Sequence, residues 1–398
     1  MNMDSLLQPE TCRVAVAGAG SMGAGIAQVA ILAGHTTCLY DTRKEAVIKA
    51  VNEIRDSVFR MRDKGKISGE VADAALQRLI PANELEALKG AGLFIEAVIE
   101  DPEIKKDLFK RVEVLMSPDT ILATNTSSLS VTAIAAACEH TGRVIGLHFF
   151  NPAPLMPLVE VIPAVQTDAA LPATCAGLMR KWGKVPVVTK DTPGFIVNRL
   201  ARPFYGESLR IYEEGLADMP TIDHALKSIG GFRMGPFELM DLIGNDVNYT
   251  VTETVWRQFY FDPRYRPSLV QKKMLESGRL GRKTGHGYYD YNDGALRQTP
   301  SDDPALHNMI FMRVVSMLIN EAAEALYLGI AGREDLDVAM TKGVNYPKGL
   351  LAWSDELGSG NVLSILDGLH DAYRDDRYRA SVLLRRMAAA EERFYPLV

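Results

Sequence analysis

Two ionisable side chains, His148 and Glu160, stand twelve residues apart in the otherwise apolar stretch HFFNPAPLMPLVE. Three prolines interrupt the chain between them, so a turn could fold the glutamate back onto the histidine. An imidazole exchanges a proton near neutral pH, and a carboxylate bonded to one ring nitrogen would fix its tautomer. The pair could therefore move a proton in a reaction. Taken alone, such a pair is more often two polar groups that hydrogen-bond each other inside a core. The rest of the sequence must decide between a core pair and a catalytic pair.

A glycine-rich turn over residues 18–23 fits the dinucleotide-binding pattern G-x-G-x-x-G. The apolar run RVAVA precedes it and the helical period of SMGAGIAQVAILAGH follows it, which is the strand–turn–helix context that the pattern requires. The glycines would allow a tight turn and a close approach to a pyrophosphate at the start of the helix. A glycine turn that binds nothing is the weaker alternative. The predicted cofactor contacts here are Gly18, Gly20, Ser21, Met22 and Gly23.

An acidic residue at the end of the next predicted strand indicates which dinucleotide binds. Asp41 closes the run TTCLYD, 18 residues after Gly23. Its carboxylate would accept hydrogen bonds from the ribose hydroxyls and repel a 2′-phosphate, which favours NAD over NADP. Arg43 lies close by and keeps NADP open as the minor alternative. Oxidation of an alcohol by NAD requires a base on the hydroxyl, and His148 ends a predicted strand, where such folds bind their ligands.

Short apolar runs alternate with helical periods through residues 13–192, and this alternation predicts a mostly parallel sheet with helices on both faces. After TPGF the sequence becomes almost entirely helical. The expected fold is an α/β Rossmann-like doubly wound domain followed by two related all-α domains. The predicted strands are 13–20, 36–41, 92–100, 120–125, 143–150, 158–162 and 185–191.

The helical part repeats itself. When residues 207–244 are laid over 321–358 with a constant shift of 114, eight of the 38 pairs are identical. Composition alone would give roughly two or three identities, so we interpret the match as an internal duplication of one helical domain. The expected domains are an NAD-binding domain over 1–192, a first helical domain over 193–296, and a second, degenerate helical copy over 297–398.

Composition excludes several other classes of protein. The chain of 398 residues has a net charge of −6, which does not suit a nucleic-acid binder. No apolar stretch is as long as a membrane span, and the N-terminal residues do not resemble a secretion signal. Four scattered cysteines give no metal or redox spacing and predict reduced thiols in the cytoplasm. We therefore expect no metal, no membrane and no nucleic acid.

Seven blocks of this sequence, in order, resemble the L-3-hydroxyacyl-CoA dehydrogenase family over about residues 12–292. They are GAGSMGAGIAQ, EAVIED, ATNTSSLS, GLHFFNPAPLMPLVEVI, KDTPGFIVNRL, GGFRMGPFELMDLIG and GRKTGHGYYDY. The doubled helical part resembles the dehydrogenase part of multifunctional fatty-acid oxidation enzymes, whose hydratase domain has no counterpart in this sequence. The resemblance implies reversible, NAD-dependent oxidation of an L-3-hydroxyacyl-CoA to the 3-ketoacyl-CoA.

The resemblance also implies roles for individual residues. His148 would be the general base and Glu160 its partner, while Ser127 and Asn198 would hydrogen-bond the substrate's 3-oxygen or its surroundings. Asn151 would lie at the same site. By the same resemblance, the cofactor pocket would be lined by Glu100, Lys105 and Asn125. Coenzyme A would be met by Ser57 and Lys64.

Structural interpretations of several of these residues stay open at the level of sequence. Ser127 and Asn125 could cap the helix that begins near VTAIAAAC, and Asn198 could cap a helical turn. Lys64 lies in the charged run RMRDKGK, which would also suit a solvated helix end. Two other functions are alternatives: dehydrogenation of a free hydroxy acid such as a sugar acid, and NAD binding without catalysis.

The second helical copy lacks key features of the first. Met312 stands where the first copy has Asn198, and no GRKTG-type loop follows it, so we expect no second active site. In the family that this sequence resembles, members with one helical domain dimerise through that domain. We therefore expect the second copy to serve as a pseudo-dimer partner within the chain.

Overall fold

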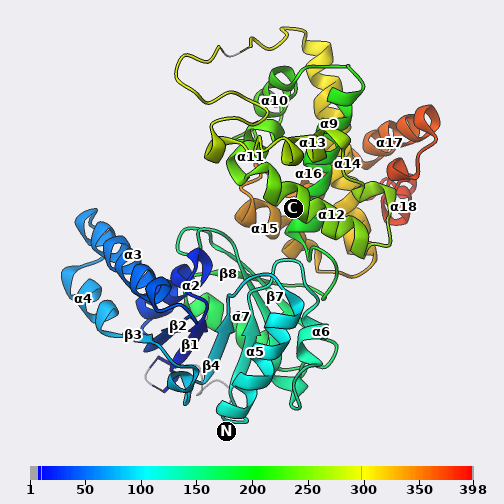
Figure 1. The fold of residues 1–398 in the computed structure, drawn as a ribbon. Helices are drawn as coiled ribbons and strands as arrows, with labels where there is room; N and C mark the ends of the chain where they lie inside the picture. Colours follow the sequence, from blue (N-terminus) through cyan, green and yellow to red (C-terminus); the bar gives the residue numbers. More distant parts are fainter. Residues whose placement is uncertain (1–7, 10, 297, 397–398) are drawn as a thin grey trace. The chain divides into compact units, whose positions relative to one another are not determined.

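The computed structural model describes residues 8–9, 11–296 and 298–396, and its elements are shown in Figure 1. Contacts divide the chain into two compact units, with the boundary between Phe195 and Ile196. The first unit is α/β, and the second is built from helices with two isolated bridges within residues 281–290. The predicted fold class is confirmed. The division of the helical part into two domains at residue 296 stays a prediction, because both copies lie in one compact unit.

The first unit contains one eight-stranded sheet of order β3-β2-β1-β4-β5-β6-β7-β8. Neighbouring strands are parallel except β6 and β7, which pair antiparallel. The order reverses at β1, which lies between β2 and β4, so the crevice of the doubly wound fold opens there. The strands are β1 (Val14–Ala17), β2 (Thr37–Tyr40), β3 (Leu79–Ala82), β4 (Leu93–Glu96), β5 (Ile121–Thr124), β6 (Val144–Phe149), β7 (Leu158–Pro163) and β8 (Val185–Val188).

Helices cover both faces of this sheet, and each face has its own core. Along β1 the side chains alternate, so Val14 and Val16 join one apolar cluster while Ala15 and Ala17 join the other. Both clusters are buried, which explains why the central strands are continuously apolar. The first cluster includes residues of α2 (Ser21–Leu32), α3 (Lys44–Asp63), α4 (Gly69–Gln77) and α7 (Leu171–Lys181), and the second those of α5 (Pro102–Leu115) and α6 (Val131–Ala135).

The second unit repeats one helical order twice. After α8 (Val197–Leu200), α11 corresponds to α16 and the start of α12 to the start of α17, each with a shift of 114 residues. The first series is α9 (Arg202–Glu213), α10 (Met219–Ser228), α11 (Pro236–Ile243), α12 (Asn245–Gln258) and α13 (Leu269–Glu276). The second is α14 (Pro304–Tyr327), α15 (Arg333–Gly343), α16 (Leu350–Leu357), α17 (Ser359–Tyr373) and α18 (Val382–Ala390).

The identical residues of the two copies make identical contacts. Asp223 accepts hydrogen bonds from the backbone of Phe237 and Glu238 at the start of α11, at 2.9 and 3.0 Å. Asp337 does the same at the start of α16, again at 2.9 and 3.0 Å. A Cβ on Gly235 or on its counterpart Gly349 would lie within 2.4 Å of the aspartate side chain, so both positions require glycine. These contacts explain why the aspartate and glycine pairs match between the copies.

Buried ion pairs join the two copies reciprocally. Arg199 Nε lies 2.5 Å from Glu321 Oε1, and Arg313 Nε, 114 residues later, lies 2.6 Å from Glu207 Oε1. The hydroxyls of Tyr265 and Tyr378 repeat the pattern, since each donates to the glutamate of the other copy at 2.6 Å. A contact in which residue i meets j while the counterpart of i meets the counterpart of j is the signature of a two-fold interface.

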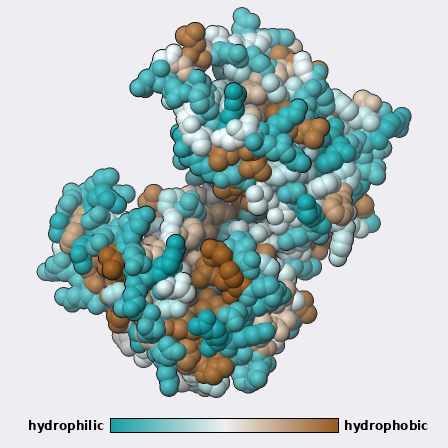
Figure 2. Space-filling model, in the orientation of Figure 1, coloured by the Kyte–Doolittle hydropathy of each residue, from teal (hydrophilic) through white to brown (hydrophobic). Residues whose placement is uncertain are grey.

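The surface of both units is mostly hydrophilic, with separate apolar patches (Figure 2). No helix among the described residues combines the length and apolar composition that a bilayer span requires.

Candidate active site

The antiparallel pairing of β6 and β7 brings His148 and Glu160 together. The two residues stand opposite each other in the register, and His148 Nδ1 lies 2.6 Å from Glu160 Oε2. Glu160 is fully buried, and His148 is 6% exposed. A proton on Nδ1 is held by the carboxylate, which leaves the lone pair of Nε2 to accept a proton. The rings of Phe150 and Phe195 lie 4.5 and 5.9 Å from the imidazole and give it an apolar surrounding.

The proline-containing loop between β6 and β7 carries Asn151 and lies next to the glycine-rich turn. Ser21 Oγ, in the first turn of α2, donates to Asn151 Oδ1 at 3.4 Å, and the Asn151–Pro152 peptide is cis. Lys184 holds the loop in place, because its buried Nζ donates to the backbone carbonyls of Ala153 and Met156. Sequence reasoning missed Lys184, since nothing in its local context shows which carbonyls it will meet.

The glycine-rich turn has the shape that a pyrophosphate requires. Gly18 has φ +105°, and a Cβ there would lie 2.4 Å from the carbonyl oxygen of Ala97. A Cβ on Gly23 would lie 1.7 Å from the oxygen of Gly18, so the helix can start here only with glycine. A Cβ on Gly20 would meet nothing within 4 Å, and Gly20 is the N-cap of α2 with no side-chain cap. The helix start therefore offers N–H groups beside open space, which fits a bound phosphate.

Asp41 lines a cavity of about 450 Å³ that begins at this turn. Its Oδ2 accepts from the backbone N–H of Ala19 at 2.8 Å and its Oδ1 from that of Arg43 at 3.0 Å. Partial burial acts to raise the pKa of Asp41, but these hydrogen bonds and the Arg43 charge hold it below its usual value. Asp41 is thus an anionic acceptor at the wall of the cavity, as ribose binding requires.

A buried ionic network connects the predicted cofactor residues Glu100 and Lys105 with Ser127. Lys105 Nζ lies 3.2 Å from Glu100 Oε2 and 2.6 Å from the fully buried Glu96, at the end of β4. Glu100 Oε1 in turn accepts from the backbone N–H of Ser127 at 2.8 Å and from its hydroxyl at 3.2 Å. Burial acts to raise the pKa of Glu100, and the Lys105 charge and these bonds hold it below its usual value. Sequence reasoning did not single out Glu96, whose pKa burial raises and which also accepts from Thr124 of the neighbouring strand at 2.7 Å.

Neither Asn125 nor Ser127 caps α6. The cap is Ser130, whose side chain accepts from Ala133, so the capping interpretation of the two earlier residues is wrong. Asn125 Oδ1 instead accepts from the backbone N–H of Phe149 at 2.8 Å, at the end of β6. Asn125 therefore connects the end of β5 to the residue that follows His148.

The remaining predicted residues lie on helices. Ser57 and Lys64 are seven residues apart along α3 and its C-cap, about two turns, so they share one face of the helix. Met22 lies in the first turn of α2. Asn198 lies within α8 of the second unit, whose N-cap is Ile196, so Asn198 does not cap that helix. Its backbone carbonyl accepts from Arg202 Nε at 2.8 Å.

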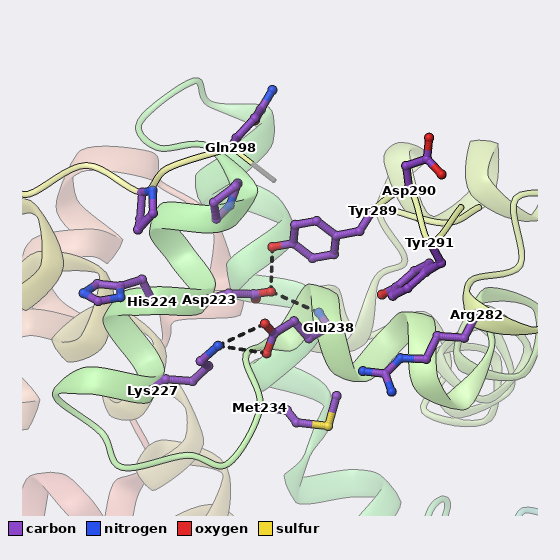
Figure 3. A pocket seen from close by; sticks show the side chains of 12 residues that line it. Asp223, His224, Lys227, Met234, Glu238, Arg282, Tyr289, Asp290, Tyr291 and Gln298 are labelled. Carbon is purple, nitrogen blue, oxygen red and sulfur yellow. Dashed lines mark hydrogen bonds and ion pairs between the residues drawn. The ribbon is translucent and has the colours of Figure 1, made fainter. Parts of the chain in front are cut away.

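A cavity of about 420 Å³ lies in the second unit (Figure 3). Tyr289 points its hydroxyl at Asp223, at 2.7 Å, and Lys227 lies 2.9 Å from Glu238. The second copy repeats the tyrosine–aspartate contact, since the Tyr395 hydroxyl lies 3.1 Å from Asp337, whereas Thr341 and Ala352 stand at the positions of Lys227 and Glu238. Because the tyrosine–aspartate contact recurs in a copy without the predicted active-site residues, we assign that contact to the start of the helix and not to the chemistry.

Family models match both parts of the chain. The model described as "3-hydroxyacyl-CoA dehydrogenase, NAD binding domain" matches residues 13–192. The model described as "3-hydroxyacyl-CoA dehydrogenase, C-terminal domain" matches residues 194–291 and again residues 309–393. The second match confirms the duplication of the helical domain.

Individual relatives and a solved structure are similar to this chain over most of their length. The chain is 39% identical to a 3-hydroxyadipyl-CoA dehydrogenase of Escherichia coli K12, over 95% of this chain and 98% of that protein. It is 40% identical to a 3-hydroxybutyryl-CoA dehydrogenase of Clostridioides difficile, over 70% of this chain and 99% of that protein. A crystal structure described as 3-hydroxybutyryl-CoA dehydrogenase from Escherichia coli K12 has a TM-score of 0.91 and 38% identity, over 96% of this chain and 98% of that one.

Proposed function

Because the chain belongs to the 3-hydroxyacyl-CoA dehydrogenase family, and is an NAD-dependent oxidoreductase of 3-hydroxyacyl-CoA, we propose that His148 and Glu160 are its acid–base pair. The observation that carries this proposal is the 2.6 Å contact between Nδ1 and the buried carboxylate. With Nδ1 held, Nε2 takes the proton of the substrate's 3-hydroxyl, and Glu160 stabilises the imidazolium that forms. In the reverse direction Nε2 returns the proton to the 3-oxygen.

Bound NAD would supply the acceptor for the hydride from C3 of the substrate. The chain's own contribution is binding and orientation. Residues 18–23 would hold the pyrophosphate at the start of α2, and Asp41 would hold the adenosine ribose. Glu100, Lys105 and Asn125 line the cofactor side. Asn198 and Ser127 hydrogen-bond the 3-oxygen or its surroundings, and Asn151 borders the same site. Ser57 and Lys64 meet coenzyme A.

The test of this proposal is NADH consumption with acetoacetyl-CoA by the wild type and by His148→Gln. Loss of a general base typically costs ~10²–10⁴ in rate, about 3–5 kcal/mol of barrier, so His148→Gln should lose activity by that factor or more. NADH binding, followed by fluorescence, should survive. The exposed His140→Gln is the matched control and should behave as wild type. Activity retained in His148→Gln would remove His148 from the mechanism.

We propose further that the second helical copy is a pseudo-dimer partner within the chain. The reciprocal Arg199–Glu321 and Arg313–Glu207 pairs support this role, because they repeat one contact in both directions. The second copy also reproduces the docking of a two-residue segment on a helix. The backbone N–H groups of Phe394 and Tyr395 donate to Asp355 as those of Tyr288 and Tyr289 donate to Asp241.

We propose a cytoplasmic location, which the four buried, free cysteines support because a reducing compartment preserves thiols. Fractionation of the native host's cells would test it, and recovery with the membranes or the secreted proteins would contradict it.

A further inference from the structure

One buried arginine of the second unit has no carboxylate partner. The described part of the chain holds six buried arginines, and five of them have a carboxylate oxygen at 3.9 Å or less. The sixth, Arg202 at the start of α9, makes no ion pair among the described residues. Its Nε donates to the carbonyl of Asn198 at 2.8 Å, and its Nη1 donates to the hydroxyl of Thr252 at 3.0 Å. Both partners are neutral, and the guanidinium carbon lies 5.0 Å from the centroid of the Tyr205 ring, so an aromatic face but no carboxylate meets the positive charge.

A buried arginine without a carboxylate partner is unusual, because removing its charge from water is unfavourable. Arg202 is 6% exposed, and burial lowers the pKa of its guanidinium, as it does for Arg210, whereas close carboxylate partners raise the pKa of Arg199 and Arg313. Replacement by an apolar residue would avoid this cost. A ligand anion that binds Arg202 would offset it.

A second polar group near Arg202 also lacks a partner. The hydroxyl of Tyr346, on the second copy, is buried and has no hydrogen-bond partner among the described residues. Tyr346 and Arg202 interact electrostatically, and the Tyr346 ring lies 5.7 Å from that of Phe204, two residues after Arg202. A guanidinium and an unsatisfied hydroxyl together offer donors and positive charge, which suits a carboxylate.

The position of Arg202 relates this donor pair to the substrate. Arg202 follows Asn198 by four residues and contacts its backbone, and we have proposed that the Asn198 side chain binds the 3-oxygen. One helical turn rises about 5.4 Å, which is comparable with the reach from C3 to a carboxylate at C6 of an acyl chain. We infer that Arg202 binds the terminal carboxylate of a dicarboxylic 3-hydroxyacyl-CoA. This inference rests on the proposed function, since it requires Asn198 at the 3-oxygen.

The test compares two substrates of equal chain length, 3-oxoadipyl-CoA and 3-oxohexanoyl-CoA, which differ by a carboxylate in place of a methyl group. The wild type should have the higher kcat/KM with 3-oxoadipyl-CoA. Arg202→Gln should lower the ratio of the two kcat/KM values roughly 10- to 100-fold, mainly through KM for 3-oxoadipyl-CoA, because a charged hydrogen bond is lost. Arg202→Lys, which keeps the charge, should keep part of the preference.

The matched control is Arg210→Gln, a buried arginine on the same helix whose carboxylate partner is Glu207. It removes a buried cation that has a carboxylate oxygen at 3.9 Å and does not contact Asn198, so the ratio should stay at the wild-type value whatever happens to stability. Equal losses on both substrates in Arg202→Gln would make Arg202 a positioning residue for Asn198 and overturn the inference.

If Arg202→Gln does not fold, the substrate preference of the wild type alone tests the inference. Activity on both substrates without a preference for the carboxylated one overturns this inference and leaves the proposed function intact. Inactivity of the wild type on both substrates and on acetoacetyl-CoA overturns the two together.

Discussion

We predict that Asp41 determines cofactor choice through a single carboxylate with two fixed oxygens. The backbone N–H groups of Ala19 and Arg43 hold it in place, so it is already oriented before a ribose arrives. Asp41→Ala should raise KM for NADH roughly 10- to 100-fold, because a hydrogen bond to a charged group is lost. NADPH use should improve relative to NADH, since the repulsion of a 2′-phosphate disappears while Arg43 remains.

Steady-state kinetics with both cofactors would check this prediction, with the exposed Asp73→Ala on α4 as the control for a lost surface charge. An unchanged NADH/NADPH ratio in Asp41→Ala would show that the ribose is held elsewhere.

At the scale of residues, the sequence predicted side chains in recognisable motifs and missed those whose role depends on distant partners. Asp41 and His148 were predicted as site residues because strand ends and glycine turns can be recognised locally. Glu96 and Lys184 were not singled out, because only folding shows that Glu96 meets Lys105 and that Lys184 meets carbonyls of another segment. Arg202 was missed for the opposite reason: its distinguishing feature is the lack of a carboxylate partner, which only a three-dimensional structure shows.

At the scale of elements, the loop between β6 and β7 shows what pairing adds to sequence. The prolines indicated a turn, yet both a buried core pair and a catalytic pair remained open. The antiparallel register decided the geometry, since it sets His148 opposite Glu160. Lys184, directly before β8, then holds the carbonyls of Ala153 and Met156 in that loop.

Lys184 predicts a pH dependence of stability. Burial lowers its pKa from 10.5 to about 8, so the native state loses this proton near pH 8 while the unfolded chain keeps it up to about pH 10.5. In that window the unfolded state binds more protons, and the free energy of unfolding contributed by Lys184 therefore rises with pH. Relative to Lys184→Met, the wild type should gain stability between pH 8 and pH 10.

Urea unfolding across this range would measure the difference. Lys184→Arg, which stays charged throughout, should show no such gain, and the exposed Lys181→Met should follow the wild type. Parallel stability curves for the wild type and Lys184→Met would contradict the prediction.

At the scale of the whole molecule, the duplication was visible in sequence but its consequence was not. Matching glycines and aspartates indicated two copies of one domain, and the structure shows that these residues build the helix starts within each copy. The glutamate pair behaves differently. Glu207 and Glu321 reach across to arginines of the other copy, so their identity records the interface between the copies.

The role of the second copy as an intrachain partner makes a specific prediction about cooperativity. Glu321→Gln should lower the free energy of unfolding by about 3–5 kcal/mol, because it leaves the buried Arg199 of the other copy without a carboxylate partner. Glu207→Gln should cost less, because Arg313 keeps its ion pair with Glu214. If the copies stabilise each other, either variant lowers the transition of the whole second unit. The surface control Glu276→Gln, which breaks an exposed pair with Lys272 inside one copy, should cost less than about 1 kcal/mol. Native-state hydrogen exchange would separate the copies: weakened protection confined to the copy that carries the substitution would show that they fold independently, whereas equal weakening in α9–α13 and α14–α18 is the result expected of a dimer contained in one chain.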